Sequence, residues 1–288
     1  MATDRPLPRT VTYGLFPLLL GAAVVAVAAA STPDARVARI PLVLVATIGI
    51  AMIVERWRPL ERRWGMTARG LGRRDLPYIG AGLVLERVSE IAVAAIARRT
   101  LPRGGFGPAA QLPMGLQVVV AIVAFDLLWY AYHRAAHGHD RLWRVHGAHH
   151  APGQLYVLVH GVFHPFDELV VRFVLALAVY RFGGFSPMAT PIALTIVGVI
   201  GILSHVNADV RLWALNHVFV GPETHRYHHS ADHQVNFGTA TSLWDQVFGT
   251  FHFAPTPPAR LGLARPEAYP DIERFHRVLV WPLQRERQ

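Results

Sequence analysis

Long apolar stretches alternate with short arginine-rich segments over the first two thirds of this chain. The apolar stretches cover residues 13–30, 40–54, 76–97, 116–132, 169–180 and 191–203. A helix needs ~20 largely apolar residues to span a bilayer, and the first and fourth stretches are good candidates. The pattern predicts an all-α protein, a polytopic membrane helical bundle of about 4–6 spans.

Two of these stretches allow more than one interpretation. Arg5 and Arg9 precede the first, and the alanines at 28–30 resemble a signal-peptidase site. We expect a retained first helix, because further apolar runs follow. The third stretch carries Glu86, Arg87 and Glu90, so it is either a span whose charges face protein or a cavity or an interfacial helix.

Arginine placement predicts the orientation of the bundle. Seven arginines lie between residues 56 and 74, and loops rich in arginine remain in the cytoplasm. Two crossings later the chain returns to that side near residue 133, and the hairpin 169–203 goes out and comes back. We therefore expect an integral, multi-pass protein with its histidines on the cytoplasmic side, although Arg98, Arg99 and Arg103 would face outward.

The chain is expected to be a single domain over residues 1–288. Residues 1–125 form the N-terminal membrane helices, 126–252 the histidine-bearing core, and 253–288 an interfacial tail. Segments 133–165 and 205–252 are richer in polar and aromatic residues than the spans, which predicts a helical cap on the cytoplasmic face. The basic amphipathic stretch at 275–281 should lie on the headgroups.

Composition supports a membrane protein. Of the 288 residues, 52% are hydrophobic and 16% are charged, whereas soluble domains carry about 25% charged residues. Cysteine is absent, which excludes disulfides, iron–sulfur clusters and thiolate zinc sites on this chain. All 28 basic residues are arginines and the formal charge is +9. Because they flank apolar runs, we expect lipid headgroups rather than nucleic acid as their partner.

Histidine is concentrated in one part of the chain, since 14 of 16 lie between residues 133 and 233. Three sets have helical spacing, and residues three and four apart are neighbours on a helix. These sets are His133 and His137, then His146, His149 and His150, then His225, His228 and His229. Eight imidazoles exceed what one ion can use, so the spacing predicts a dinuclear metal centre.

Two classes of histidine-rich membrane protein, a hydrolase and a transport protein, match this pattern less well. Imidazole suits iron, copper and zinc, so ligand type alone does not choose the metal. A membrane zinc-dependent hydrolase would use fewer histidines and usually a carboxylate, and a metal-binding transport protein would carry histidines along its spans. Soluble di-iron proteins use paired Glu-x-x-His motifs, but the single match, Glu273 to His276, lies in the tail.

The motifs resemble the membrane fatty acid hydroxylase and sterol desaturase superfamily. The resemblance is carried by DLLWYAYHRAAH (126–137), LWRVHGAHH (142–150), HP (164–165), SHVN (204–207) and VGPETHRYHHSADHQVNFGTATSLWDQVFGTF (220–251). It implies a non-haem di-iron oxidoreductase that uses O2 to hydroxylate or desaturate an unactivated C–H bond of a lipid. Sequence does not separate these two outcomes.

The resemblance also implies the metal ligands. They are His133, His137, His146, His149, His150, His225, His228 and His229, with His205 as a ninth. Some relatives have another histidine four residues after the one that matches His205, where this chain has Asp209. Candidates for a tenth ligand are His217 first, Asn207 through a water, and Asp209 itself.

Other polar residues near the motifs are expected to orient the ligands or the backbone around them, because such partners fix the ring tautomer of a metal-binding histidine. They are Asp126, His160, His164, Asn207, His233, Asn236 and Asp245. For His139, His252 and His276 we expect an ordinary structural role.

The implied cofactors are two iron ions, which zinc can replace in purified protein, with O2 as co-substrate. The chain has no flavin or dinucleotide fingerprint, so electrons must come from a separate donor, a ferredoxin or a small cytochrome with its reductase. An acidic donor could dock on the arginine-rich face. The substrate is expected to be apolar: a fatty acyl chain, an ornithine-type lipid, or a sterol-like or terpenoid ring.

Overall fold

The protein folds into helices, as the apolar pattern predicts. The computed structural model describes residues 6–100, 108–171, 179 and 183–284. Over these residues there is no β-strand, and β pairing is limited to two isolated bridges, Phe219 with Thr241 and Ser230 with Leu261. The expected all-α fold class is confirmed.

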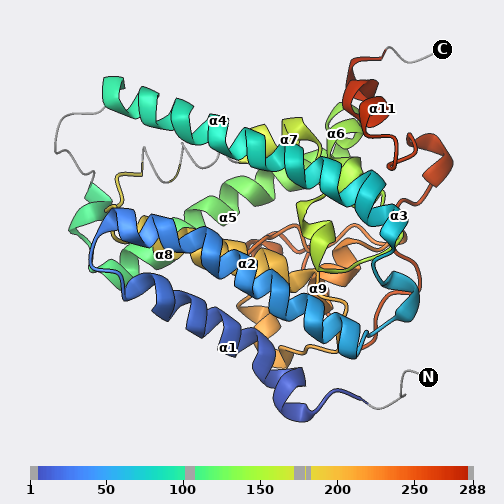
Figure 1. The fold of residues 1–288 in the computed structure, drawn as a ribbon, viewed down its shortest axis with the longest axis horizontal. Helices are drawn as coiled ribbons and strands as arrows, with labels where there is room; N and C mark the ends of the chain where they lie inside the picture. The colour runs from blue at the N-terminus through green and yellow to red at the C-terminus, as the bar shows by residue number, and fades with distance from the viewer. Residues whose placement is uncertain (1–5, 101–107, 172–178, 180–182, 285–288) are drawn as a thin grey trace.

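Long helices run roughly side by side and form the body of the molecule (Figure 1). They are α1 (Arg9–Ala28), α2 (Pro33–Trp57), α4 (Leu76–Thr100), α5 (Met114–Gly138) and α8 (Thr190–Ser204). The shorter α-helices of the described residues are α3 (Ala68–Gly70), α6 (Asp140–His150), α7 (Pro165–Leu169), α9 (Pro222–His228), α10 (Leu243–Val247) and α11 (Phe275–Val280). Short helical turns are η1 (Arg62–Trp64), η2 (Leu71–Asp75), η3 (Pro108–Gln111), η4 (Val157–Gly161), η7 (Trp213–His217), η8 (Pro266–Ala268) and η9 (Trp281–Leu283).

Three of the described helices, α1, α2 and α5, are long and apolar enough to cross a membrane. Helix α8 is apolar but has only 15 residues. In α4, Arg87 pairs with Glu90 at 2.7 Å on the exposed surface. The apolar stretch at 169–180 falls largely outside the described residues. The chain therefore has the helices of a membrane protein, and the expected number of spans stays a prediction.

The turn between α1 and α2 is closed around one buried arginine. Thr32 caps the start of α2 through its hydroxyl, a preferred N-cap residue. The Arg36 guanidinium, 5% exposed, donates to the carbonyl oxygens of Ala28 and Ala30 at 2.9 Å and of Met188 at 2.6 Å. It satisfies carbonyls left open where α1 ends and ties the approach to α8 to this turn.

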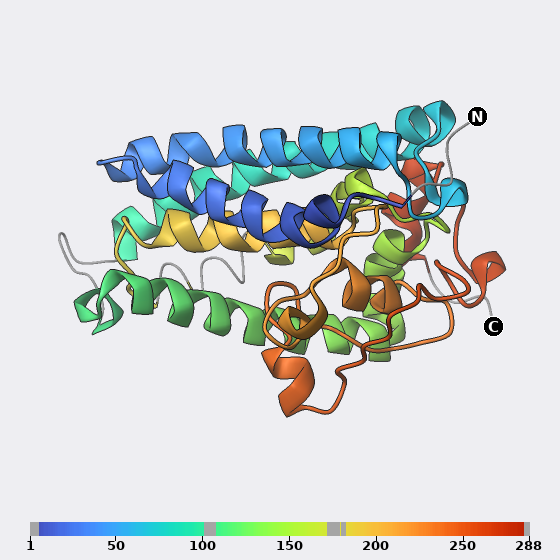
Figure 2. The same ribbon diagram turned by 90° about the horizontal axis from the view of Figure 1, so that it is seen from below.

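The C-terminal ends of α2, α5 and α8 meet at one end of the bundle, where α6, α9 and the C-terminal segment also lie (Figure 2). A continuous apolar core connects α1, α2, α5 and α8. The helices thus form a rigid base that brings the histidine-bearing segments to the same end.

The C-terminal segment packs against this end of the protein. In α11, Val278 is fully buried and the Phe275 ring meets the edge of Tyr78 in α4 at a centroid distance of 4.8 Å. The Tyr269 hydroxyl donates to the carbonyl of Arg144 in α6 at 2.9 Å. One side of the expected interfacial tail is therefore held on protein.

Candidate metal centre

Histidines from four segments come together where α5, α6, α8 and α9 meet. Their ring nitrogens form two groups, in each of which the chosen ligand atoms all lie within 4.8 Å of one another. The first group is His133, His137, His146, His150 and His228, and the second is His149, His205, His225 and His229. These are the nine histidines that the family resemblance implied, and they form clusters able to bind metal.

Helical pitch explains how the two groups divide the motifs. Residues four apart differ by about 40° around a helix, whereas adjacent residues differ by about 100°. The i,i+4 pairs therefore stay together: His133 with His137, His146 with His150, and His225 with His229. His149 and His228 point to the opposite group from their helical neighbours. Helices α6 and α9 thus each serve both groups, which makes the two groups adjoin.

Hydrogen bonds to backbone carbonyl oxygens fix the orientation of several histidine rings. A carbonyl oxygen only accepts, so the Nδ1 atom bonded to it must carry the proton and the Nε2 atom is left with a lone pair. The pairs are His133 with Phe237 at 2.7 Å, His149 with Val162 at 3.1 Å, His205 with Gly201 at 2.8 Å and His228 with Val235 at 3.0 Å. These rings present a metal-binding atom to the cluster.

Distances between the Nε2 atoms fit nitrogens that share a cation. In the second group His205 Nε2 lies 3.2 Å from His149 Nε2 and 3.1 Å from His225 Nε2, and His225 lies 3.1 Å from His229. Two lone pairs, as on His149 and His205, cannot hydrogen-bond to each other. Nitrogens ~2.1 Å from one ion lie ~3.0 to ~3.4 Å apart at right or tetrahedral angles. The spacing matches that range.

In the first group, buried nitrogen atoms without a hydrogen-bond partner also indicate a site for a cation. The Nε2 atoms of His133, His137 and His228 are buried and have no hydrogen-bond partner among the described residues. A buried polar atom without a partner costs about 1–3 kcal/mol. A metal ion satisfies all three at once, so the donor set fits an all-imidazole metal site.

Burial keeps these rings in the form that binds metal. It is the largest cause that lowers the pKa of six clustered histidines beyond α5, and neighbouring imidazoles lower the pKa further. The pKa of His228 falls to about 3, and the pKa falls well below the ordinary value for His149, His150, His205, His225 and His229. Neutral imidazole is the ligating form, so no proton has to leave before metal binds near neutral pH.

One carboxylate that orients a clustered histidine was missed from the sequence. Asp167 in α7 accepts from His146 Nδ1 at 3.1 Å, and the Tyr132 hydroxyl donates to its other oxygen. His164 helps to place Asp167, because its Nδ1 accepts from the backbone N of Phe166 at 3.1 Å and caps α7. The available signal was the acidic residue two positions after His164-Pro165.

Asp245 acts on the centre through the backbone. Its two oxygens accept from the N–H groups of Phe237 at 2.7 Å and Gly238 at 2.8 Å, and the Phe237 carbonyl accepts from His133. The preceding residue, Asn236, has φ +57°, a left-handed conformation that asparagine tolerates. Asp245 and Asn236 therefore shape the loop that fixes the His133 ring.

Asp126 also holds a loop. Its carboxylate accepts from the backbone N–H groups of Thr239 and Ala240 at 2.9 Å and of Thr241 at 3.2 Å, and from the Thr241 hydroxyl at 2.5 Å. These bonds tie α5 to the segment that follows Gly238. The described hydrogen bonds of Asp126 are thus with backbone N–H groups and a threonine hydroxyl, and not with the clustered histidines themselves.

The three candidates for a tenth ligand point elsewhere. His217 is exposed and its ring lies on Phe251 at a centroid distance of 4.8 Å. The Asn207 amide is engaged by the backbone of Glu61. Asp209 forms an ion pair with Arg211 at 2.7 Å. None of these side chains belongs to the two groups of clustered histidines.

His160 is the nearest further imidazole to the second group. Its ring centroid lies 5.1 Å from that of His205. Gly201 makes room for it, since a Cβ there would come within 2.7 Å of His160 Cε1. His233, by contrast, stacks on His252 at 5.5 Å and contacts Ser230.

The chain matches known proteins over the segment that carries the site. Residues 118–250, which include all nine histidines, match the family model described as fatty acid hydroxylase. An ornithine lipid hydroxylase, OlsE, of Rhizobium tropici is 32% identical over 252 residues, which is 84% of this chain and 76% of that protein.

Two further relatives match shorter segments. The lathosterol oxidase of Homo sapiens is 26% identical over 148 residues, 49% of this chain and 48% of that protein. A very-long-chain aldehyde decarbonylase of Oryza sativa subsp. indica is 30% identical over 136 residues, 43% of this chain and 21% of that protein. No solved structure matches the chain.

Proposed function

The chain belongs to the fatty acid hydroxylase family, and on that premise we propose that it hydroxylates an unactivated C–H bond of a membrane lipid with O2. The observation that supports this proposal most is the pair of adjoining histidine groups. Two iron ions held there, by His133, His137, His146, His150 and His228 and by His149, His205, His225 and His229, would supply the oxygen chemistry.

The protein's own side chains would keep that chemistry dry and fixed. Eight of the nine histidines are buried, and His137 is nearly so. Phe163 stacks on His149 at 4.0 Å, and Trp129 lies 5.0 Å from His133. An apolar wall of this kind excludes water, which would otherwise divert reactive species.

Iron is the metal that this donor set and family support together. The two groups contain histidine only, whereas a catalytic zinc site keeps about three protein ligands and commonly includes a carboxylate. The transport alternative is also poorly supported, because the histidines lie at one end of the bundle. We therefore keep the hydrolase and transport roles only as outcomes of metal analysis.

The reaction requires electrons from outside this chain. Hydroxylation of R–H consumes O2, two electrons and two protons and yields R–OH and water. The chain has no cysteine for an iron–sulfur cluster, so we propose that a ferredoxin, or a small cytochrome with its reductase, delivers the electrons. The arginines between residues 56 and 74 lie near the end that holds the histidines (Figure 2) and suit an acidic donor.

The test is product analysis with labelled oxygen. The full chain, loaded with iron and supplied with donor and reductase, is incubated under ¹⁸O₂ with an ornithine lipid and then with acyl and sterol lipids. The ornithine lipid comes first because the match to the ornithine lipid hydroxylase covers most of the chain. We expect one labelled oxygen in the product, and His205→Ala as an inactive control. An unsaturated product without label would instead show desaturation. The absence of any O2-dependent product would contradict the proposal.

A further inference from the structure

A groove runs along the end of α2 on the same side of the molecule as the histidines. Two hollows of ≈ 460 Å³ and ≈ 500 Å³ share Met52, Arg56 and Met66 as lining residues. They therefore form one continuous depression, which we call the α2 groove. Its two halves differ in chemistry.

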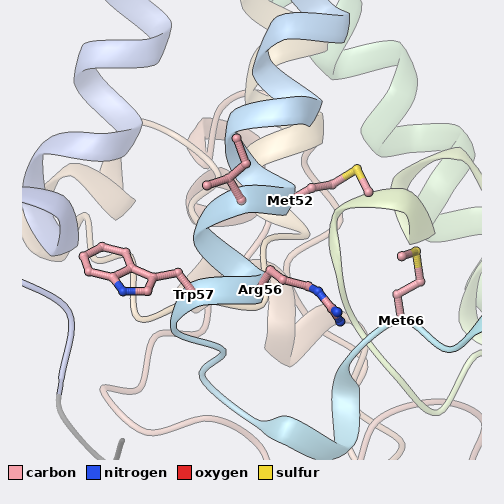
Figure 3. Close-up of a pocket in the computed structure, with 5 residues that line it drawn as sticks. Met52, Arg56, Trp57 and Met66 are labelled. Atoms are coloured by element: carbon pink, nitrogen blue, oxygen red, sulfur yellow. The ribbon is translucent and has the colours of Figure 1, made fainter. Parts of the chain in front are cut away.

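One half of the α2 groove is apolar. It is lined by Met52, Ile53, Trp57 and Met66, with Arg56 at its edge. Figure 3 shows the Met52 and Met66 side chains on the same side of α2, with Arg56 reaching below them and Trp57 directed to the opposite side. Ile53 is 68% exposed and Trp57 51%. Because α2 is a candidate span and tryptophan favours the membrane interface, this half faces acyl chains.

The other half is positively charged. Arg56, Arg62 and Arg63 line it and are exposed. Glu61 lies 3.5 Å from Arg63, and the Oε1 atom of Glu55 accepts from two backbone N–H groups, at 2.7 and 2.8 Å. Arginines near the end of a span attract anionic headgroups.

The loop that presents these arginines is held in place. The side-chain amide of Gln154 donates to the carbonyls of Arg63 at 3.4 Å and Gly65 at 3.3 Å. Asn207 bonds both backbone groups of Glu61, at 2.9 and 3.0 Å. A guanidinium on a braced loop loses less conformational freedom when it pairs with a phosphate.

We propose that the α2 groove binds one anionic phospholipid, with its phosphate on Arg62 and Arg63 and an acyl chain against Met52 and Met66. A free phosphate would use only the charged half, whereas a lipid uses both. The proposal does not depend on the oxidation chemistry.

Native mass spectrometry of the full chain tests this proposal. Protein exchanged into nanodiscs of phosphatidylglycerol is expected to retain one lipid, and protein in phosphatidylcholine none. Arg62→Gln with Arg63→Gln should weaken retention about tenfold or more, as expected for losing charge-assisted phosphate contacts. The matched control, Arg73→Gln with Arg277→Gln, removes the same charge from exposed positions outside the groove and should retain the lipid.

Two further arms separate the sources of the anion. Met66→Gln should weaken lipid retention but leave binding of glycerol 3-phosphate unchanged, and it serves if the arginine variant does not fold. Equal retention by the two double variants would overturn the site. Displacement of the lipid by inorganic phosphate at millimolar concentration would overturn the lipid and leave only an ion site.

Discussion

Nδ1 of His146 lies 3.1 Å from Oδ2 of Asp167, and both side chains have no exposed surface. The contact joins α6 to α7 and leaves Nε2 of His146 to face His150 at 3.2 Å. A carboxylate that accepts from the outer nitrogen of a ligand fixes its tautomer and raises its basicity. Asp167 is therefore a positioning residue for the first histidine group.

Replacing Asp167→Asn tests that role. The amide keeps the shape but removes the charge, so we expect metal affinity to fall about 10–100-fold, the usual effect of losing such a partner. Retained iron after titration with a chelator measures it. Asp232→Asn, an exposed residue paired with Arg260, is the control and should behave as the parent. Unchanged iron retention in Asp167→Asn would show that the contact is only structural.

Metal content should distinguish the clustered histidines from His217. His205→Ala removes a member of the second group, so iron should fall from about two to about one ion per chain, because three imidazoles hold the ion less well than four. His217→Ala removes an exposed ring and should leave both ions. Elemental analysis with protein quantification gives the ratio. If the His217→Ala variant lost iron and the His205→Ala variant did not, His217 would again be a candidate for the tenth ligand.

Acid should destabilise the metal-free protein. Burial lowers the pKa of six clustered histidines, to about 3 for His228 and well below the ordinary value for His149, His150, His205, His225 and His229. These six stay neutral in the folded state, while the unfolded chain binds protons below about pH 6.5. Stability is fully present above that pH and is lost as pH falls toward the folded pKa.

Thermal unfolding of the metal-free chain between about pH 8 and about pH 5 measures this effect. The free energy of unfolding should fall by more than about 1 kcal/mol per pH unit, which is the slope expected when unfolding takes up a single proton. A melting temperature that is constant or rises on acidification would contradict the neutral cluster.

Gly201→Ala should disturb the second group from outside it. The added Cβ would come within 2.7 Å of His160 Cε1, and the His160 ring abuts His205. Overpacking of this kind costs about 1–3 kcal/mol. Unfolding and iron content both report it. Gly21→Ala, inside α1, meets nothing within 4 Å; it is the matched control and should keep or slightly raise stability, because alanine favours the helix more than glycine does. Equal stability of the two variants would mean that His160 moves freely.

The sequence was informative wherever periodicity carried the signal. Apolar runs located the long helices, although α2 begins at Pro33, seven residues before its apolar run, because a capped start with Arg36 inside satisfies the neighbouring carbonyls. The helical spacing selected eight of the nine histidines that the structure brings together, and the family resemblance added His205.

What the sequence did not contain was the partner of each ring. Carbonyl oxygens, such as those of Phe237 and Val162, have no residue-type signature, so their role follows only from the folded backbone. In the sequence nothing distinguishes Asp167 from the other acidic residues, and only the position of α7 in the fold shows that it contacts His146. Helical pitch separates His149 from His150, but which group each ring joins depends on the relative rotation of the helices, which spacing alone does not give.

Helix α9 completes both histidine groups, since it contributes His228 to one and its flanking pair, His225 and His229, to the other. Neither histidine group is complete until this seven-residue helix has emerged from the ribosome. A nascent chain truncated before residue 225 would leave both groups incomplete, so any metal binding would have to follow synthesis of the core.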